Sequence, residues 1–167
     1  MLEIKKLTML DGEDIYEMLQ EMPYDENGFV NGAHGLSFED YKAWLEKEAK
    51  SSEQVGLVDG WKVPQTVFWF FEDGVPVGMG KIRHFLTDAL KAAGGNVGYA
   101  IRPTKRGRGL GRAFVKMLID EARGMGVEEI LITVHKDNVP SLKAALSAGG
   151  VLEKTENGRH YVWVHRR

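Results

Sequence analysis

The sequence contains no cysteine, so thiol catalysis, disulfide bonds and thiolate metal sites are all excluded. It also lacks any apolar run near the roughly 20 residues that a membrane span needs, and residues 1–14 lack the apolar core of a signal peptide. Both absences favour a soluble protein of the reducing cytoplasm that has no membrane partner. With 167 residues, of which 43% are apolar and 28% charged, we expect one globular domain spanning residues 1–167.

Acidic residues are missing from one segment of an otherwise acidic chain. Residues 99–119 contain no Asp or Glu but six basic residues, and the rest of the chain has 16 basic against 24 acidic residues. A single basic segment predicts a phosphate-bearing partner at one place rather than along a whole face. The six basic residues are Arg102, Lys105, Arg106, Arg108, Arg112 and Lys116.

Hydrophobic periodicity predicts alternating strands and helices along the chain. Asp11 is expected to cap the first helix, which Pro23 ends, and Ser37 to cap the second, whose aromatic stripe is expected in the core. Residues 24–36 are expected to form an irregular loop. This order predicts an α/β (α+β) fold with a mixed sheet and helices on both faces. The expected strands are 2–7, 66–71, 77–86, 96–102, 129–135, 151–153 and 159–165, and the later helices are 88–93, 110–124 and 138–148.

Glycine is abundant at 20 residues, and Gly107, Gly109 and Gly111 alternate directly before an amphipathic helix. Such a turn lets an anion approach the unpaired N–H groups of the helix. The ATP-binding P-loop needs four residues between its glycines and then Gly-Lys-Ser or Gly-Lys-Thr, and neither is present. The dinucleotide signature is G-x-G-x-x-G rather than the G-x-G-x-G seen here, although Glu128 lies about 20 residues further on. A turn that binds nothing is the structural alternative, and it leaves the six basic residues unexplained.

A third kind of anion site matches more of the segment. Arg106-x-x-Gly109-x-Gly111, after a strand that ends at Pro103, resembles the acetyl-CoA signature R/Q-x-x-G-x-G/A of the GNAT superfamily of N-acetyltransferases. Residues 130–138, followed by Ser141 and Gly149, resemble the next strand and helix of that superfamily. Residues 31–36, 83–86, 94–99 and 149–151 further resemble a branch of predicted acetyltransferases whose substrates are unknown.

The resemblance implies a fold and a cofactor site. The sheet is expected to be mostly antiparallel, with six to seven strands that splay apart between the fourth and the fifth. Acetyl-CoA is expected as co-substrate, with its pyrophosphate on the backbone between Gly107 and Arg112 and its pantetheine arm along the strand at Tyr99. Asn138 is expected to contact that arm from the other side. The cofactor-binding residues implied are Tyr99, Ala100, Ile101, Arg106, Gly107, Arg108, Gly109, Leu110, Gly111, Arg112, Asn138 and Ser141.

The chemistry implied is direct attack of an amine on the thioester in a ternary complex. An amine with a pKa near 10.4 is charged at pH 7, and its deprotonation costs about 4.6 kcal/mol. Histidine suits this proton transfer because its ordinary pKa is near 6.5. His84, near the end of the strand that precedes the cofactor strand, is the first candidate base, and His135 is the second.

Other roles follow from the same resemblance. The tyrosine that protonates the leaving thiolate in many members corresponds to Ala145, so Tyr99 and Tyr161 are the candidate substitutes. His34 and Tyr24 lie in the segment that covers the acceptor site, which makes them candidate substrate-binding residues. No two histidines stand at the helical spacing of metal ligands, so no metal is expected.

Partners and alternative functions follow from these features. The expected acceptor is a small-molecule or protein amine. The absence of the usual tyrosine keeps a non-catalytic acyl-CoA-binding sensor as the alternative function. The basic segment lacks the interleaved aromatic residues of single-strand binders, so no nucleic-acid partner is expected. A homodimer through the final strand, as is common in the superfamily, remains open.

Overall fold

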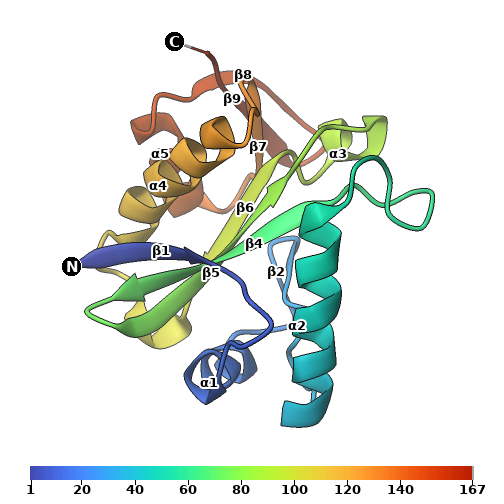
Figure 1. Ribbon diagram of the computed structural model, residues 1–167. Coiled ribbons are helices and arrows are strands. Elements are labelled where there is room, and N and C mark those ends of the chain that lie inside the picture. The colour runs from blue at the N-terminus through green and yellow to red at the C-terminus, as the bar shows by residue number, and fades with distance from the viewer. Residues whose placement is uncertain (167) are drawn as a thin grey trace.

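The strands form two main sheets in a computed structural model that describes residues 1–166 (Figure 1). The first sheet has the order β1-β4-β5-β6, the second has the order β7-β9-β8, and all neighbours within them are antiparallel. A separate two-stranded hairpin consists of β2 and β3. The strands are β1 (Leu2–Lys6), β2 (Asp25–Glu26), β3 (Phe29–Val30), β4 (Gln65–Glu72), β5 (Val75–Arg83), β6 (Val97–Ile101), β7 (Ile130–His135), β8 (Val151–Glu156) and β9 (Arg159–Val164).

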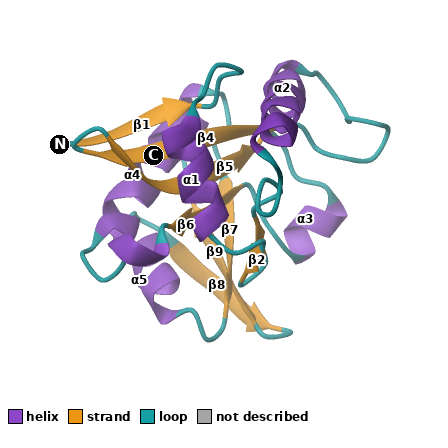
Figure 2. Ribbon diagram, turned by 90° about the horizontal axis from the view of Figure 1, so that it is seen from below, coloured by secondary structure: helices purple, strands orange, loops and turns teal. Residues whose placement is uncertain are grey.

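The helices cover both faces of the sheets (Figure 2). One face packs against α1 and α2, and the other packs against α4 and α5, so each face has its own hydrophobic cluster. In β4, Phe68 and Phe70 point into one cluster while Val67, Trp69 and Phe71 point into the other. This strand is therefore apolar throughout instead of alternating, as expected where both faces are buried. The helices are α1 (Glu13–Glu21), α2 (Phe38–Glu53), α3 (Asp88–Ala92), α4 (Leu110–Gly124) and α5 (Val139–Ser147), with a 3-10 turn η1 (Pro103–Lys105).

The mixed fold with a mostly antiparallel sheet is confirmed, and so is the splay. Leaving aside the β2–β3 hairpin, β6 is the fourth strand along the chain and β7 is the fifth. Among the described residues no strand ladder joins them. They are connected just before β6, where the Asn96 N–H donates to the Leu131 carbonyl at 2.8 Å and the Leu131 N–H donates to Asn96 Oδ1 at 3.0 Å. Beyond this connection the two strands separate.

Three local predictions were wrong: a tertiary contact overrides the first, and the second overlooked the local turn signal of an Asn-Gly pair. Asp11 does not cap α1; its carboxylate accepts a hydrogen bond from Trp69 Nε1 at 2.7 Å, and Gly12 takes the cap position without a side-chain bond. Residues 24–36 are not wholly irregular, because Asn27 and Gly28 form the left-handed turn of the β2–β3 hairpin. The strand expected to reach residue 86 ends at Arg83.

The second helix is capped as predicted, and its stripe is only partly buried. Ser37 Oγ accepts a hydrogen bond from the Asp40 N–H at 3.1 Å. Tyr41 and Leu45 are fully buried, whereas Phe38 remains 37% exposed. Among residues 1–166, none of the helices combines the length and apolar character that a membrane crossing requires.

The junction between the sheets requires glycine at position 95. Gly95 has a φ of +63°, and a Cβ placed there would lie 2.4 Å from the Leu131 carbonyl oxygen. Gly126, at the end of α4, also has a positive φ but no atom within 4 Å of such a Cβ. Both glycines satisfy a left-handed backbone, but only Gly95 permits a close approach of two chains.

We expect Gly95→Ala to lose about 1–3 kcal/mol more unfolding free energy than Gly126→Ala, because it adds a backbone collision to the same conformational strain. Urea denaturation of both variants measures this difference. Equal losses would contradict the assigned role of the close approach at Gly95.

Candidate functional site

A cavity of about 510 Å³ lies where the end of β6, the glycine turn before α4 and the start of α5 meet. It brings together residues predicted from two motifs, the first beginning at Arg106 and the second ending at Asn138. Eleven of the twelve predicted cofactor-binding residues line it: Tyr99, Ala100, Ile101, Arg106, Gly107, Gly109, Leu110, Gly111, Arg112, Asn138 and Ser141.

The glycine turn presents the open end of α4 to this cavity. Gly107 and Gly109 have φ values of +81° and +77°, and Gly109 is the N-cap of the helix without any side-chain capping bond. The first N–H groups of α4 therefore lack the usual side-chain acceptor, and the positive end of the helix dipole adds to their attraction for an anion. A Cβ at Gly111 would meet the Tyr99 ring at 3.4 Å, so this position also permits close packing of helix on strand.

The opposite wall of the cavity is the start of α5. Asn138 is the N-cap of this helix, and its Oδ1 accepts a hydrogen bond from the Ser141 N–H at 3.4 Å. Asn138 Nδ2 donates to no protein atom in residues 1–166 and is available to a ligand. The Tyr99 hydroxyl lies 3.4 Å from Ser141 Oγ, so β6 and α5 meet through side chains across the cavity.

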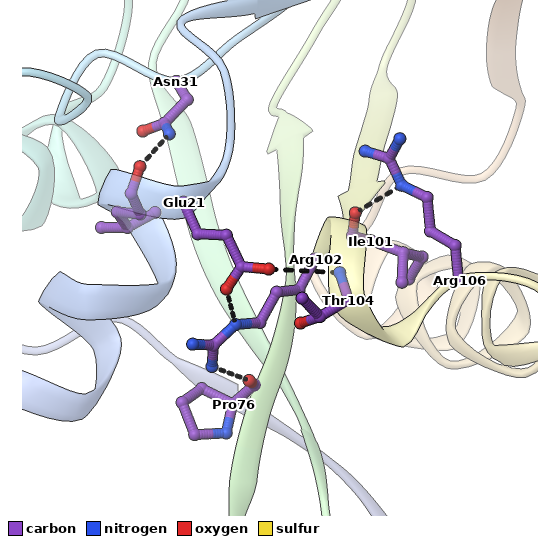
Figure 3. Close-up of polar contacts among 8 residues, drawn as sticks. Glu21, Asn31, Pro76, Ile101, Arg102, Thr104 and Arg106 are labelled. Atoms are coloured by element: carbon purple, nitrogen blue, oxygen red, sulfur yellow. Dashed lines mark hydrogen bonds and ion pairs between the residues drawn. The ribbon is translucent and has the colours of Figure 1, made fainter.

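Several arginines of the basic segment already have carboxylate partners within the protein. Figure 3 shows Glu21 of α1 accepting hydrogen bonds from the Arg102 side chain and from the Thr104 N–H, the latter at 3.1 Å. Arg102 also donates to the Pro76 carbonyl at 3.2 Å. These contacts hold the chain in place between β6 and the glycine turn.

Two further arginines of the segment have carboxylate partners. Arg106 donates to the Ile101 carbonyl at 3.0 Å (Figure 3) and pairs with Glu26 of β2. Arg108 pairs with Glu72 of β4, and it is the one predicted cofactor residue that does not line the cavity. The basic charge left at the cavity comes from Lys105 and Arg112, together with Lys143 of α5, which sequence reasoning missed.

A smaller cavity of about 200 Å³ continues into the opening between β6 and β7. It shares Tyr99, Asn138 and Ser141 with the first cavity and reaches Gly98 on one strand and His135 on the other. The predicted splay is thus an actual gap between the strands, adjoining the open helix end.

Comparison with known proteins agrees with this geometry. A family model described as the acetyltransferase (GNAT) family matches residues 14–149. The chain belongs to the GNAT acetyltransferase family. No curated protein matches the chain.

Solved structures share the fold of this GNAT protein at low sequence identity. A GNAT-family acetyltransferase from Streptococcus pneumoniae superposes with a TM-score of 0.64 at 18% identity, covering 98% of this chain and 97% of that one. The Campylobacter jejuni N-acetyltransferase PseH, in complex with acetyl coenzyme A, has a TM-score of 0.65 at 16% identity with 100% of both chains covered. A putative acetyltransferase from Salmonella typhimurium with its cofactor acetyl-CoA has a TM-score of 0.61 at 18% identity, covering 99% of this chain and 94% of that one.

The candidate bases of this GNAT protein lie in different places. His135 lines the smaller cavity, and its Nδ1 accepts a hydrogen bond from the Asp137 N–H at 3.3 Å. His84 lines neither cavity, and its Nε2 lies 2.8 Å from Thr66 Oγ1. Burial, with a smaller contribution from Lys6, lowers the pKa of His84.

The candidate acids also differ in position. Tyr99 lines both cavities. Burial raises the pKa of its phenol, so the hydroxyl is protonated at neutral pH. Tyr161 lines neither cavity, and its hydroxyl donates to the Ala92 carbonyl at 2.6 Å. Ala145, at the position of the usual tyrosine, is buried in the core.

A third cavity, of about 620 Å³, lies between α2, the loop over residues 54–63 and the end of β5. Tyr24 lines it, whereas His34 is exposed on the loop and lines none of the three cavities. Two basic residues of β5, Lys81 and Arg83, also line it and were missed by sequence reasoning. The available signal was the placement of two cations in an otherwise apolar strand. Residues 1–166 contain no cluster of three or more His, Cys, Asp or Glu residues suited to a metal.

Lys81 is the most buried cation that lines these cavities. Only 7% of the residue is exposed, its ammonium donates to the Val30 carbonyl, and it lies 4.8 Å from the centre of the Phe29 ring. Burial, reinforced by the nearby charge of Arg83, lowers the pKa of Lys81 from 10.5 to about 8. At neutral pH the ammonium is still charged, so the folded protein carries a buried charge that lowers its stability.

This burial predicts a pH-dependent stability difference. Below pH 8 Lys81 is charged in both states, whereas between about 8 and 10.5 the folded state loses the proton first. Stability rises with pH wherever the unfolded state binds more protons. We expect the unfolding free energy of the wild type, relative to Lys81→Met, to rise by about 2–3 kcal/mol across that window.

Urea denaturation at a series of pH values measures this difference. Lys91→Met, which removes an exposed lysine of α3, serves as the control and should show no such rise. A difference between wild type and Lys81→Met that stays constant with pH would contradict the buried charge.

Proposed function

We propose that the chain binds acetyl-CoA in the cavity of about 510 Å³ and transfers the acetyl group to a primary amine in a ternary complex. The observation that carries this proposal is the open N-terminus of α4, behind Gly107 and Gly109, facing Asn138 across the gap between β6 and β7. A pyrophosphate suits this place because N–H donors, a helix dipole and free cations converge on it. The solved proteins that hold acetyl coenzyme A share the same fold.

The free edge of β6 supports the placement of the pantetheine arm. One edge of this strand pairs with β5, while the other faces the gap toward β7. A strand edge without a neighbour presents N–H and C=O groups that need partners. The amide groups of pantetheine supply such partners at Tyr99, Ala100 and Ile101, and a backbone N–H near Ile101 then holds the oxyanion.

The transfer forms a C–N bond and breaks the C–S bond of the thioester. The amine proton goes to a base, and the departing thiolate takes a proton from an acid. We assign the acid to Tyr99, because its hydroxyl reaches Ser141, one helical turn before the Ala145 position on α5. His135 is the better placed of the two candidate bases, because it alone lines the gap.

We expect acetyl-CoA at 100 times its dissociation constant to stabilise the protein by about 2.7 kcal/mol. Gly109→Glu should abolish this stabilisation for two reasons. Its carboxylate repels the pyrophosphate, and a non-glycine residue strains the left-handed backbone at this position. Gly126→Glu is the matched control, with a positive φ at the opposite end of the same helix. Thermal unfolding with and without acetyl-CoA measures both, and absence of a shift in the wild type would refute the proposal.

Turnover separates an enzyme from a sensor. With an accepted amine, Tyr99→Phe and His135→Gln should each slow thiol release about 100-fold. His84→Gln is the matched control for His135→Gln and should retain wild-type turnover, and acetyl-CoA stabilisation should persist in all three. Binding of acetyl-CoA without thiol release on any amine would favour the acyl-CoA-binding sensor. Loss of turnover in His84→Gln but not in His135→Gln would identify His84 as the base.

A further inference from the structure

The cavity of about 620 Å³, here called the acceptor cavity, contains buried positive charge without a carboxylate partner. Lys81 and Arg83 are two positions apart on β5, so their side chains leave the same face of the strand. Lys81 donates to the Val30 carbonyl, and Arg83 Nη1 donates to the Gly94 carbonyl at 3.1 Å. Within residues 1–166 neither forms an ion pair. Buried charges are normally held in ion pairs, and these two cations depart from that rule.

The carboxylates around the acceptor cavity only partly balance this charge. Burial lowers the pKa of Lys81 and the negative charge of Glu48 acts to raise it, but Glu48 forms no ion pair with Lys81 in residues 1–166. Its lining has five basic side chains against two carboxylates, Glu48 and Asp59. Glu48 accepts a hydrogen bond from Gln65 Nε2 at 3.2 Å, and Asp59 lies on an exposed loop. The cavity therefore attracts anions and repels polycations, in a setting where partial burial weakens the screening by salt.

The walls of the acceptor cavity are aromatic. Trp44 of α2 and Trp61 of the 54–63 loop both line it, and Trp61 is 71% exposed. Lys62 lies 5.7 Å from the centre of the Trp61 ring and adds a cation near the exposed side. Flat apolar walls with a basic floor favour a small organic anion over a bare inorganic one.

One residue joins the acceptor cavity to the cleft between β6 and β7. Arg83 lines the acceptor cavity and also the cavity of about 200 Å³ that contains His135. An acceptor held at Arg83 is thus next to the cavity that contains His135, the proposed base. The position suits a molecule whose anionic end stays in the acceptor cavity while its amine enters the cleft.

We propose that the acceptor is a primary amine that carries its own anionic group, a carboxylate or a phosphate, and that Lys81 and Arg83 bind this group. This inference rests on the proposed acetyl transfer and narrows its substrate class. It excludes polyamines, whose charges the cavity repels.

Matched pairs of amines test the inference. γ-Aminobutyrate is compared with its amide, and O-phosphoethanolamine is compared with ethanolamine, so the two pairs distinguish a carboxylate from a phosphate source. We expect the acidic member of at least one pair to have a kcat/KM about ten-fold higher or more, since a charge-assisted bond is worth about that factor. Spermidine should be the poorest substrate.

Variants connect the preference to the cavity. Lys81→Met and Arg83→Gln should each remove most of the preference for the acidic amine. Lys62→Met changes only an exposed side chain, so it should reduce this preference without affecting folding. Lys91→Met does not touch the cavity and should leave the preference unchanged. Preference for the neutral members or for spermidine, or persistence of the acidic preference in Lys81→Met combined with Arg83→Gln, would overturn the inference.

A binding measurement keeps this test separate from the test of acetyl transfer. Thermal stabilisation by γ-aminobutyrate or O-phosphoethanolamine, in the absence of acetyl-CoA, should exceed that by the neutral partners. This readout needs no turnover. Stabilisation by the acids without thiol release would therefore retain the inferred anion site and refute the transfer. Thiol release without any preference for the acidic amines would support the transfer and refute the inferred anion site.

Discussion

The whole cleft depends on one junction, at which Asn96 ties the two main sheets together and beyond which they part. Its backbone N–H and its side-chain Oδ1 engage both polar groups of Leu131, while Nδ2 donates to the Arg83 carbonyl at 3.3 Å. The Arg83 N–H in turn donates to the Asn96 carbonyl at 2.7 Å. A buried amide that satisfies so many backbone groups is costly to replace. Because the strands are secured there, they can separate beyond it without loss of the core, and one edge of β6 faces the cavity between the sheets.

The charges of the basic segment divide between structure and binding. Glu21 engages Arg102, Glu26 engages Arg106 and Glu72 engages Arg108, so carboxylates from α1, β2 and β4 surround the approach to the glycine turn. Partly exposed ion pairs contribute little stability individually, but three of them from separate elements restrict the turn to one place. The N–H groups of α4 are thereby preorganised, and Lys105, Arg112 and Lys143 line the cavity without forming an ion pair in residues 1–166.

Patterns local in the sequence predicted the parts of the fold and site that depend on local chemistry. The alternating glycines, the helix that follows them and the strand edge at Tyr99 each depend on neighbours in the chain, and the structure brings them together as expected. Asp11 and Arg108 depend on Trp69 and Glu72, which lie far away in sequence, so no local pattern could assign them. Lys81 was missed for a different reason. Its strand was predicted, but the hairpin that covers its ammonium lies in a segment expected to be irregular.

The β2–β3 hairpin occupies the space between the two larger cavities and contacts both. Glu26 and Asn27 line the cavity beside the glycine turn, whereas Val30 lines the acceptor cavity. Between them, Phe29 fills the space left by Gly98, where a Cβ would lie 3.3 Å from its ring. Gly98 is the register partner of Lys81, so the same ring also covers that ammonium. A Cβ at position 98 would require the Phe29 ring to shift by a few tenths of an ångström. The glycine of β6 thus lets this ring pack closely between the two cavities and over the charge of Lys81, so the proposed cofactor and acceptor cavities lie on opposite sides of one short hairpin.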